Sequence, residues 1–284
     1  MPLVTLKEML SKAQAGQYAV GAFNCNNMEI VQAIVAAAEK ENAPVIIQAS
    51  QGAIKYAGLE FIVALTRVAA ENTKIPIALH LDHGTDFDQV MKCIRFGFTS
   101  VMIDGSKLQL EENIALTNKV IDVAHAVGVT VEAELGKIGG TEDNVSVSER
   151  EATLTSPEEA EEFSRRTNVD ALAVAIGTAH GQYKGKPELD FKRLEKIQAL
   201  VDIPLVLHGS SGVPGEDIEK AIGLGVSKVN IDTNIREAFV AGVRDVLKEK
   251  PEEIDPRKIL GPAKARMTEI IQGKIRLFGS SGKA

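Results

Sequence analysis

Short apolar runs rich in Val, Ile, Leu and Ala recur along the chain, and within each run the apolar residues are continuous rather than alternating with polar ones. Strands that are covered on both faces have this pattern, whereas a strand with one solvated face alternates. The sequence therefore predicts eight buried strands, at residues 18–23, 45–49, 77–81, 100–103, 130–135, 171–176, 205–207 and 228–231.

Segments with helical periodicity lie between these runs, at residues 28–42, 59–72, 86–96, 111–127, 157–167, 189–200 and 214–224. Ser156, Pro157 and two acidic residues give one of them the expected N-cap, first-turn proline and acidic first turn. A strict alternation of strands and helices requires a parallel sheet, and eight repeats favour a closed barrel. We therefore expect an α/β fold in which residues 1–284 form a single (β/α)8 TIM barrel.

Two segments depart from this rhythm. The connection at about 136–156 is longer than the others and rich in glycine, which predicts a mobile active-site loop that could carry Glu142 as a proton-transfer group. The segment at about 255–280 is predicted to add helical packing after the last strand.

The net charge of −7 leaves no basic field for a phosphate backbone, which argues against nucleic acid as the main ligand. Cys25 and Cys93 lack metal-type spacing and are expected to be buried thiols in a reducing cytoplasm. We expect neither a signal peptide nor a membrane span, because no apolar stretch is long enough.

Polar side chains follow the apolar runs, where the chemistry of such barrels lies. Three of the five histidines, His83, His180 and His208, fall at the ends of strands three, six and seven. Three imidazoles at one rim favour a catalytic zinc site with an open position. His80 lies inside a strand and His125 on a helix, so they are expected to be packing residues or supports for the ligands.

Two carboxylates, Asp104 and Glu134, also lie at strand ends. They could hold the metal in an alternative position, hydrogen-bond the imidazoles, or merely pair with a neighbour. Small polar residues at 209–212 and 230–233 end strands seven and eight and precede helices, which predicts a phosphate site built from backbone N–H groups, hydroxyls and a helix N-terminus.

Several motifs together resemble the class II fructose-bisphosphate aldolases, in the shorter subgroup that also includes tagatose-bisphosphate aldolases. They span nearly the whole chain and comprise GAFNCNN at 21–27, LHLDHG at 79–84, VMIDGS at 101–106, VEAELG at 131–136, GGTED at 139–143, AIGTAHGQYKG, LVLHGSSG, KVNIDTN and DPRKILGPA at 255–263. One departure is Ser210-Ser211, where many relatives have Gly-Thr or Ala-Ser.

The resemblance implies a role for each matching residue. His83, His180 and His208 would hold the catalytic zinc, and Asp104 and Glu134 a second metal position. Asp82 would be the acid–base residue and Glu142 the loop base. Ser50 would contact the aldehyde product, and Asn24 would assist phosphate binding. The remaining substrate contacts would be Gly181, Gly209, Ser210, Ser211, Asn230, Ile231, Asp232 and Thr233.

The implied reaction is reversible cleavage of D-fructose 1,6-bisphosphate to dihydroxyacetone phosphate and D-glyceraldehyde 3-phosphate through a zinc-stabilised enediolate. The implied cofactor is Zn²⁺, with a second divalent ion or a monovalent cation as further options, and the implied assembly is a homodimer or homotetramer. An imine mechanism would need a lysine at a strand end, whereas Lys228 opens its strand.

Three alternatives stay open from the sequence. The substrate could be D-tagatose 1,6-bisphosphate, which differs only at C4. A zinc-dependent hydrolase on the same barrel would be marked by a His-x-His pair after strand one, where this chain has Asn24-Cys25-Asn26. A non-catalytic barrel that binds sugar phosphates would need neither Asp82 nor Glu142.

Overall fold

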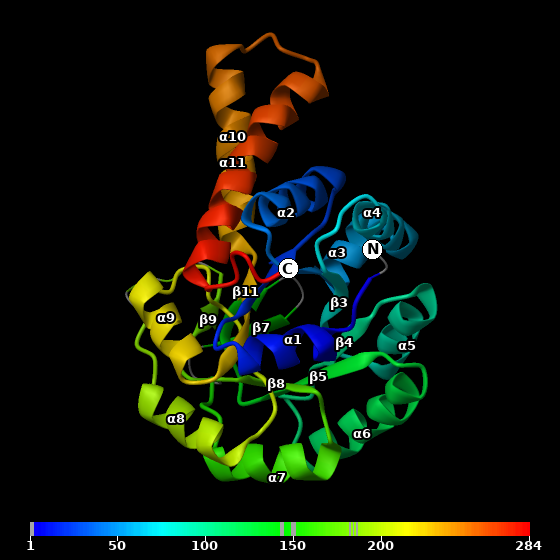
Figure 1. The fold of residues 1–284 in the computed structure, drawn as a ribbon, viewed down its shortest axis with the longest axis vertical. Coiled ribbons are helices and arrows are strands. Elements are labelled where there is room, and N and C mark those ends of the chain that lie inside the picture. Colours follow the sequence, from blue (N-terminus) through cyan, green and yellow to red (C-terminus); the bar gives the residue numbers. More distant parts are fainter. Residues whose placement is uncertain (1–2, 143–144, 149–151, 182, 184, 186) are drawn as a thin grey trace.

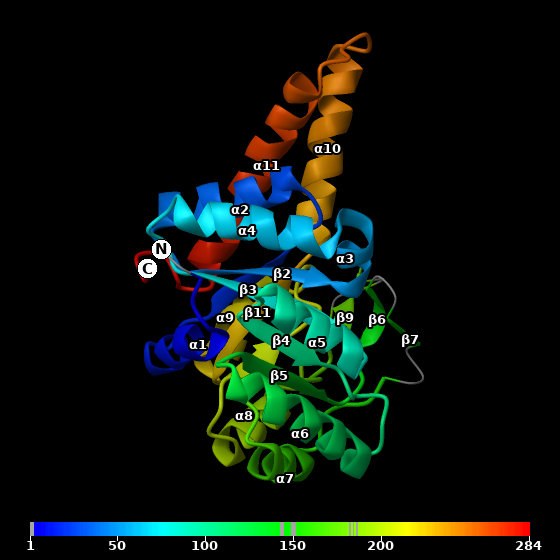
Figure 2. The same cartoon turned by 90° about the vertical axis from the view of Figure 1, so that its right-hand side faces the viewer.

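Parallel strands of the chain close into a barrel, as seen in a computed structural model that describes residues 3–142, 145–148, 152–181, 183, 185 and 187–284 (Figures 1 and 2). Around the barrel the strands run in the order β1-β11-β10-β8-β5-β4-β3-β2, and β1 pairs with both β2 and β11. The barrel strands are β1 (Val20–Asn24), β2 (Val45–Ser50), β3 (Ile77–Gly84), β4 (Ser100–Ile103), β5 (Thr130–Leu135), β8 (Ala171–Val174), β10 (Leu205–Leu207) and β11 (Val226–Ile231).

The TIM-barrel prediction is confirmed, and each predicted strand overlaps one barrel strand. The seven predicted helical segments correspond to α2 and α4 to α9, and α10 is the helix expected after residues 230–233, while α1 and α3 were not predicted. The helices of the described residues are α1 (Leu6–Ala15), α2 (Met28–Glu41), α3 (Gln51–Ala57), α4 (Leu59–Glu71), α5 (Phe87–Phe96), α6 (Leu110–Ala126), α7 (Pro157–Thr167), α8 (Phe191–Leu200), α9 (Gly215–Gly223), α10 (Thr233–Glu249) and α11 (Pro256–Leu277).

The inside of the barrel divides into an apolar half and a polar half. Helix α1 packs Leu6, Met9 and Leu10 against small or branched strand residues, among them Ala22, Ile46, Ala78, Ala173 and Val206. Two residues further along their strands, on the same face, stand Asn24, Gln48, His80 and His208. Alternate residues of a strand face the same side, so the inward face of the barrel changes from apolar residues at its base to polar residues at the carboxyl ends of the strands.

The connection after β5 contains ordered structure. Strand β6 (Gly139–Glu142) pairs antiparallel with β7 (Val145–Val147) and parallel with β9 (Ala179–His180). Gly140 has a φ of 97°, and a Cβ there would lie 2.2 Å from the carbonyl oxygen of His180. Only glycine therefore lets the connection lie this close to the strand that carries His180. That this connection moves during turnover stays a prediction.

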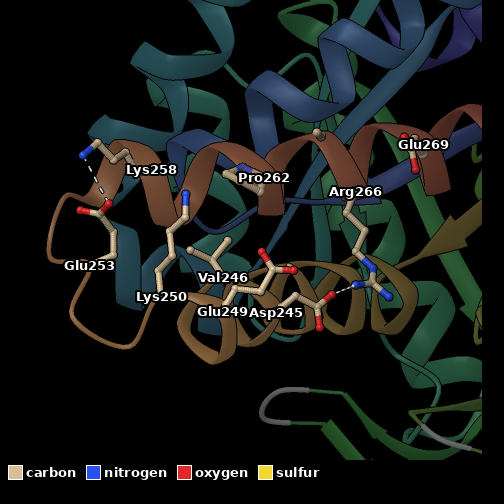
Figure 3. A pocket seen from close by; sticks show the side chains of 11 residues that line it. Asp245, Val246, Glu249, Lys250, Glu253, Lys258, Pro262, Arg266 and Glu269 are labelled. Carbon is tan, nitrogen blue, oxygen red and sulfur yellow. Dashed lines mark hydrogen bonds and ion pairs between the residues drawn. The ribbon is translucent and has the colours of Figure 1, made fainter.

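Helices α10 and α11 form an antiparallel hairpin that projects well beyond the barrel (Figures 1 and 2). The lower part of the hairpin lies beside α2 (Figure 2). Further out, the two helices enclose a groove of about 620 Å³ lined largely by charged residues (Figure 3). Arg266 pairs with Asp245 across the groove, and Lys258 pairs with Glu253 at 3.3 Å.

Candidate active site

Three buried histidines converge above the polar half of the barrel. His83 lies at the end of β3, His180 ends β9, and His208 directly follows β10. The ring of His83 is 5.0 Å from that of His180 and 4.8 Å from that of His208, and the rings are nearly perpendicular. One nitrogen from each ring lies within 4.8 Å of the others, so the geometry could hold one metal ion.

The backbone at His83 is strained. Its φ is 49°, in the left-handed region, and the register between β3 and β4 shifts between Leu81 and Gly84. A left-handed conformation in a residue other than glycine costs on the order of 1 kcal/mol and is characteristic of functional sites. The irregular strand end turns the His83 ring toward the other two histidines.

Carboxylates fix the orientation of two of the rings. His83 Nδ1 lies 3.1 Å from Asp104 Oδ2, and His208 Nε2 lies 3.0 Å from Glu132 Oε1. Because a carboxylate only accepts hydrogen bonds, the protons belong on these two nitrogens. The opposite nitrogens, His83 Nε2 and His208 Nδ1, face each other at 3.1 Å. Two lone pairs at this distance suit a shared cation.

The pKa values of two of the three histidines, His180 and His208, agree with neutral ligands. Burial and the neighbouring His83 lower the pKa of His180 to about 3. Burial, then His83 and Lys228, hold the pKa of His208 well below its usual range. Burial also opposes charge on His83, but Asp82, the hydrogen bond to Asp104 and Glu134 raise its pKa well above the usual value. A single positive charge is thus favoured at this point, and a bound metal would supply it.

Several buried oxygen atoms beside the histidines have no hydrogen-bond partner among the described residues, namely Glu134 Oε2, Asn230 Oδ1 and Gln48 Oε1. Burial and the nearby Asp104 raise the pKa of Glu134 well above its usual value. With His83, these two carboxylates form a second group of potential metal ligands. Buried acceptors without donors fit a site built for a cation.

Asp82 is fully buried and held by three amides. Asn24, Gln48 and Asn230 donate to its carboxylate at 2.8, 3.1 and 3.2 Å. Burial alone would raise the pKa of Asp82, but His83, His208, Lys228 and the Asn24 amide hold it below the usual range. An ionised carboxylate next to the histidine cluster can accept a proton from a substrate hydroxyl.

A smaller cavity of about 190 Å³ adjoins the histidines. Gly209 has a φ of 64°, and a Cβ there would lie 2.5 Å from the carbonyl oxygen of Ala179. The N-terminus of α10 and the hydroxyl of Ser211 also face this space, which gives the cavity anion-binding character. Its lining residues are Thr141, His180, Gly181, Gly209, Ser210, Ser211, Asn230, Asp232, Thr233 and Arg236.

The other predicted site residues lie in different surroundings. Ser50 caps α3 by accepting from Ala53 N at 3.1 Å, and in β2 it pairs in register with Asp82 of β3. Ile231 packs into the hydrophobic core. Glu142 ends β6, but its side chain is outside the described part of the structure.

The sequence reasoning missed five residues that the structure places at or just below the site: Gln48, Glu132, Thr141, Lys228 and Arg236. Gln48, Glu132 and Lys228 share the inward face of their strands with predicted residues two positions further on. Period-two counting back from the strand ends could have found them. Arg236 lies one helical turn after Asp232 and pairs with it at 2.7 Å, and Thr141 lies in the loop strand β6.

Comparison with known proteins gives the family. Residues 4–283 match the family described as fructose-bisphosphate aldolase class-II. The chain is 50% identical to the fructose-bisphosphate aldolase of Thermus caldophilus, covering 99% of this chain and 100% of that one, and 50% identical to that of Geobacillus stearothermophilus, covering 100% and 99%. A solved structure of the YdjI aldolase from Escherichia coli K12 is similar at 33% identity, with a TM-score of 0.87 and 99% of both chains covered. The chain belongs to the class II fructose-bisphosphate aldolase family.

Proposed function

We propose that the protein is a zinc-dependent aldolase that reversibly cleaves D-fructose 1,6-bisphosphate into dihydroxyacetone phosphate and D-glyceraldehyde 3-phosphate, in glycolysis and gluconeogenesis. The observation that carries the proposal is the convergence of His83, His180 and His208 beside an anion-binding cavity, in a chain that is similar over its full length to aldolases. Zinc bound there would supply the positive charge that offsets the charge developing on the substrate oxygens as the carbon–carbon bond breaks.

Asp82 is the proposed acid–base residue. In the cleavage direction it takes the proton from the C4 hydroxyl, which becomes the aldehyde oxygen, and in condensation it returns that proton. The three amides that hold the carboxylate leave it little freedom to turn, so the carboxylate is positioned before substrate binds. Glu142 is the proposed shuttle for the ketose-side proton.

The cavity beside α10 is the proposed site for the phosphate of dihydroxyacetone phosphate, bound by Gly181, the 209–211 turn and the 230–233 segment. Arg236 joins this set and adds the positive charge that the sequence reasoning had not supplied. Ser50 and Asn24 are the proposed contacts on the aldehyde side. Asp104 and Glu134 are proposed to hold a second metal position, and a monovalent cation is a further option.

We also propose that the protein works as a homodimer or homotetramer in the cytoplasm. The α10–α11 hairpin supports assembly because Ile254 at its tip is 88% exposed, and Leu247 and Ile270 are exposed along it. A hairpin of this length gains stability when a second subunit covers it. Within the described residues, no helix is both long and apolar enough to cross a bilayer.

The decisive test follows triose phosphate release from fructose and tagatose 1,6-bisphosphates, with and without chelator and after zinc is restored. Zinc-reversible cleavage with a higher kcat/KM for the fructose isomer supports the proposal. A higher kcat/KM for tagatose 1,6-bisphosphate would change the substrate but keep the class. Cleavage that survives complete metal removal would refute the zinc mechanism. If zinc-loaded protein cleaves neither sugar, the proposed activity is wrong and a zinc-dependent hydrolase becomes the favoured function.

A further inference from the structure

Below the three histidines, the barrel interior holds an ion pair with no access to solvent. Lys228 of β11 and Glu132 of β5 are both 0% exposed, and Lys228 Nζ lies 3.0 and 2.8 Å from the two carboxylate oxygens. His80 of β3 is also fully buried, 3.4 Å from the same Nζ, and its Nδ1 lies 2.7 Å from Ser100 Oγ. These groups fill the layer between the apolar base and the polar rim.

Stability alone does not explain such a pair. Taking two charges out of water costs about as much as their attraction returns, and apolar replacements of similar volume are often neutral or stabilising. The contacts of the ion pair with its neighbours therefore have to account for its presence here. Glu132 Oε1, which accepts from Lys228, also lies 3.0 Å from Nε2 of His208.

This contact determines which ring nitrogen of His208 has a lone pair available for a metal. Glu132 is an acceptor, so the ring carries its proton on Nε2 and leaves the lone pair on Nδ1. Nδ1 is the nitrogen that points toward His83 Nε2, 3.1 Å away. Asn230 Nδ2 also approaches the ring, but at 3.3 Å from Nδ1 and 3.4 Å from Nε2 it does not distinguish the two tautomers. Glu132 is the contact that does.

Glu132 differs from the other carboxylate that touches a ligand ring. Asp104 stands beside Glu134 and with it forms a potential metal-binding group, so it could act as a ligand itself. Glu132 lies on the far side of His208 from the cluster's centre, and both of its oxygens are engaged by Lys228. Its contact with the site runs through the His208 ring.

We propose that Glu132, anchored by Lys228, is a positioning residue that fixes the tautomer and orientation of His208 for zinc. Carboxylate partners of metal-bound histidines raise metal affinity by about 10- to 100-fold in other sites. The inference rests on the proposed zinc role of the histidine cluster and adds to it the residues that set the affinity of one ligand.

The test compares two double variants that both remove the buried charges. In E132L/K228M the acceptor is lost and the volume is roughly kept. In E132Q/K228M the amide oxygen can still accept from His208 Nε2, and the amide nitrogen faces His80 Nε2, which is 3.6 Å from Glu132 Oε2 in the native chain. The readout is the zinc dissociation constant, measured by competition with a chromophoric chelator on protein shown to be folded by circular dichroism.

We expect E132L/K228M to bind zinc about 10- to 100-fold more weakly and E132Q/K228M to recover most of that loss. The matched control is K7M/D170N, which disrupts a similar carboxylate, lysine and histidine group at the other end of the barrel and should leave zinc affinity unchanged. Equal zinc affinity in wild type and E132L/K228M, or equal losses in both double variants, would overturn the inference.

A second measurement needs no variant. In zinc-loaded wild-type protein, ¹⁵N spectra of the histidine rings should show His208 protonated at Nε2 and metal-bound at Nδ1, and the reverse assignment would overturn the inference. Wild-type protein that does not bind zinc would overturn both the inference and the proposed function. Wild-type protein that binds zinc and cleaves the sugar, with unchanged affinity in E132L/K228M, would overturn the inference alone.

Discussion

Two groups of lysine, carboxylate and histidine stand at opposite ends of the barrel, and they differ in burial. Inside the barrel, just below the carboxyl-end rim, Lys228, Glu132 and His208 are all 0% exposed. At the amino ends, Asp170 just before β8 contacts His125 at 2.8 Å and Lys7 at 2.9 Å, but the Lys7 side chain is 67% exposed and that of His125 31%.

The difference in burial separates a structural role from a functional one. Asp170 also accepts from Val131 N at 2.9 Å, so it ties β5 to β8. Its own carboxylate is buried, but its two ionic partners stay partly solvated. The buried group pays a large desolvation cost, and its side chains bond to no main-chain group of the described residues in compensation. The same three residue types therefore act as a structural clamp at one end and, in the role proposed here, as a support for a metal ligand at the other.

The largest expected effect comes from removing the histidine of each group. His208→Ala should lower kcat/KM for sugar bisphosphate cleavage by at least about 1,000-fold, since metal charge stabilisation contributes several kcal/mol. His125→Ala should leave cleavage unchanged. Steady-state kinetics with zinc in excess would check both, and a His125 variant as inactive as the His208 variant would break the contrast.

Replacing a carboxylate at each end of the barrel should give the second-largest effect. Asp82→Asn should lower kcat by about 10²- to 10⁴-fold, the usual contribution of an acid–base group. Its zinc affinity should stay close to that of wild type, because Asp82 lies beside the ligands and outside their set. Asp170→Asn should keep kcat but lose about 1–3 kcal/mol of unfolding free energy through its weakened contacts. Kinetics, chelator competition and urea unfolding distinguish these outcomes.

Replacing the lysine of each group should change the stability of the protein by different amounts. Lys228→Met leaves Glu132 charged and unpaired in the interior, so we expect a loss of about 3–5 kcal/mol of unfolding free energy. Lys7→Met breaks an exposed pair and should cost about 1 kcal/mol or less. Urea unfolding of both variants at one pH measures the two losses, and similar values would mean that burial does not govern these pairs.

A smaller effect concerns alkaline stability. Burial raises the pKa of Cys25 and of Cys93 to about 12 each, above the usual thiol value of 9.0. Between these two pH values the unfolded chain has released thiol protons that the folded chain keeps, so stability falls as pH rises from about 9 toward 12. Replacing both cysteines by alanine should flatten this dependence, measured by urea unfolding across that pH range. An unchanged slope would assign the loss to other groups.

Strand positions and the three histidines could be predicted because both depend on residues next to one another in the sequence. Continuous apolar runs mark buried strands, and His83 and His208 follow such runs closely enough to be placed at the rim of a parallel barrel. His180 lies further along the chain, at the end of β9, so the run before it placed it less directly. Lys228 was harder to place, because a lysine at the start of a strand is usually solvated. Its burial depends on Glu132, which is 96 residues away in the chain.

Other features depend on close approach in space. Strand β9 holds only two residues, and its pairing with β6 comes from tertiary contact rather than from any apolar pattern. In the sequence Gln48 looks like an ordinary strand residue, and its role depends on contacts with Asn24 and Asp82 that form only in the fold. The strained φ of His83 likewise has no signature in the sequence, because histidine itself favours the ordinary regions.

The contact between Gly140 and the His180 carbonyl oxygen limits how this enzyme could be redesigned. Loops at the rim of a TIM barrel are the usual place to graft new substrate preferences, yet this loop shares a backbone ladder with the strand that ends in His180, a proposed metal ligand. A graft that puts any side chain at position 140 would separate β6 from β9. Loop exchange in this scaffold must therefore keep a glycine at that position, whatever substrate the new loop is meant to recognise.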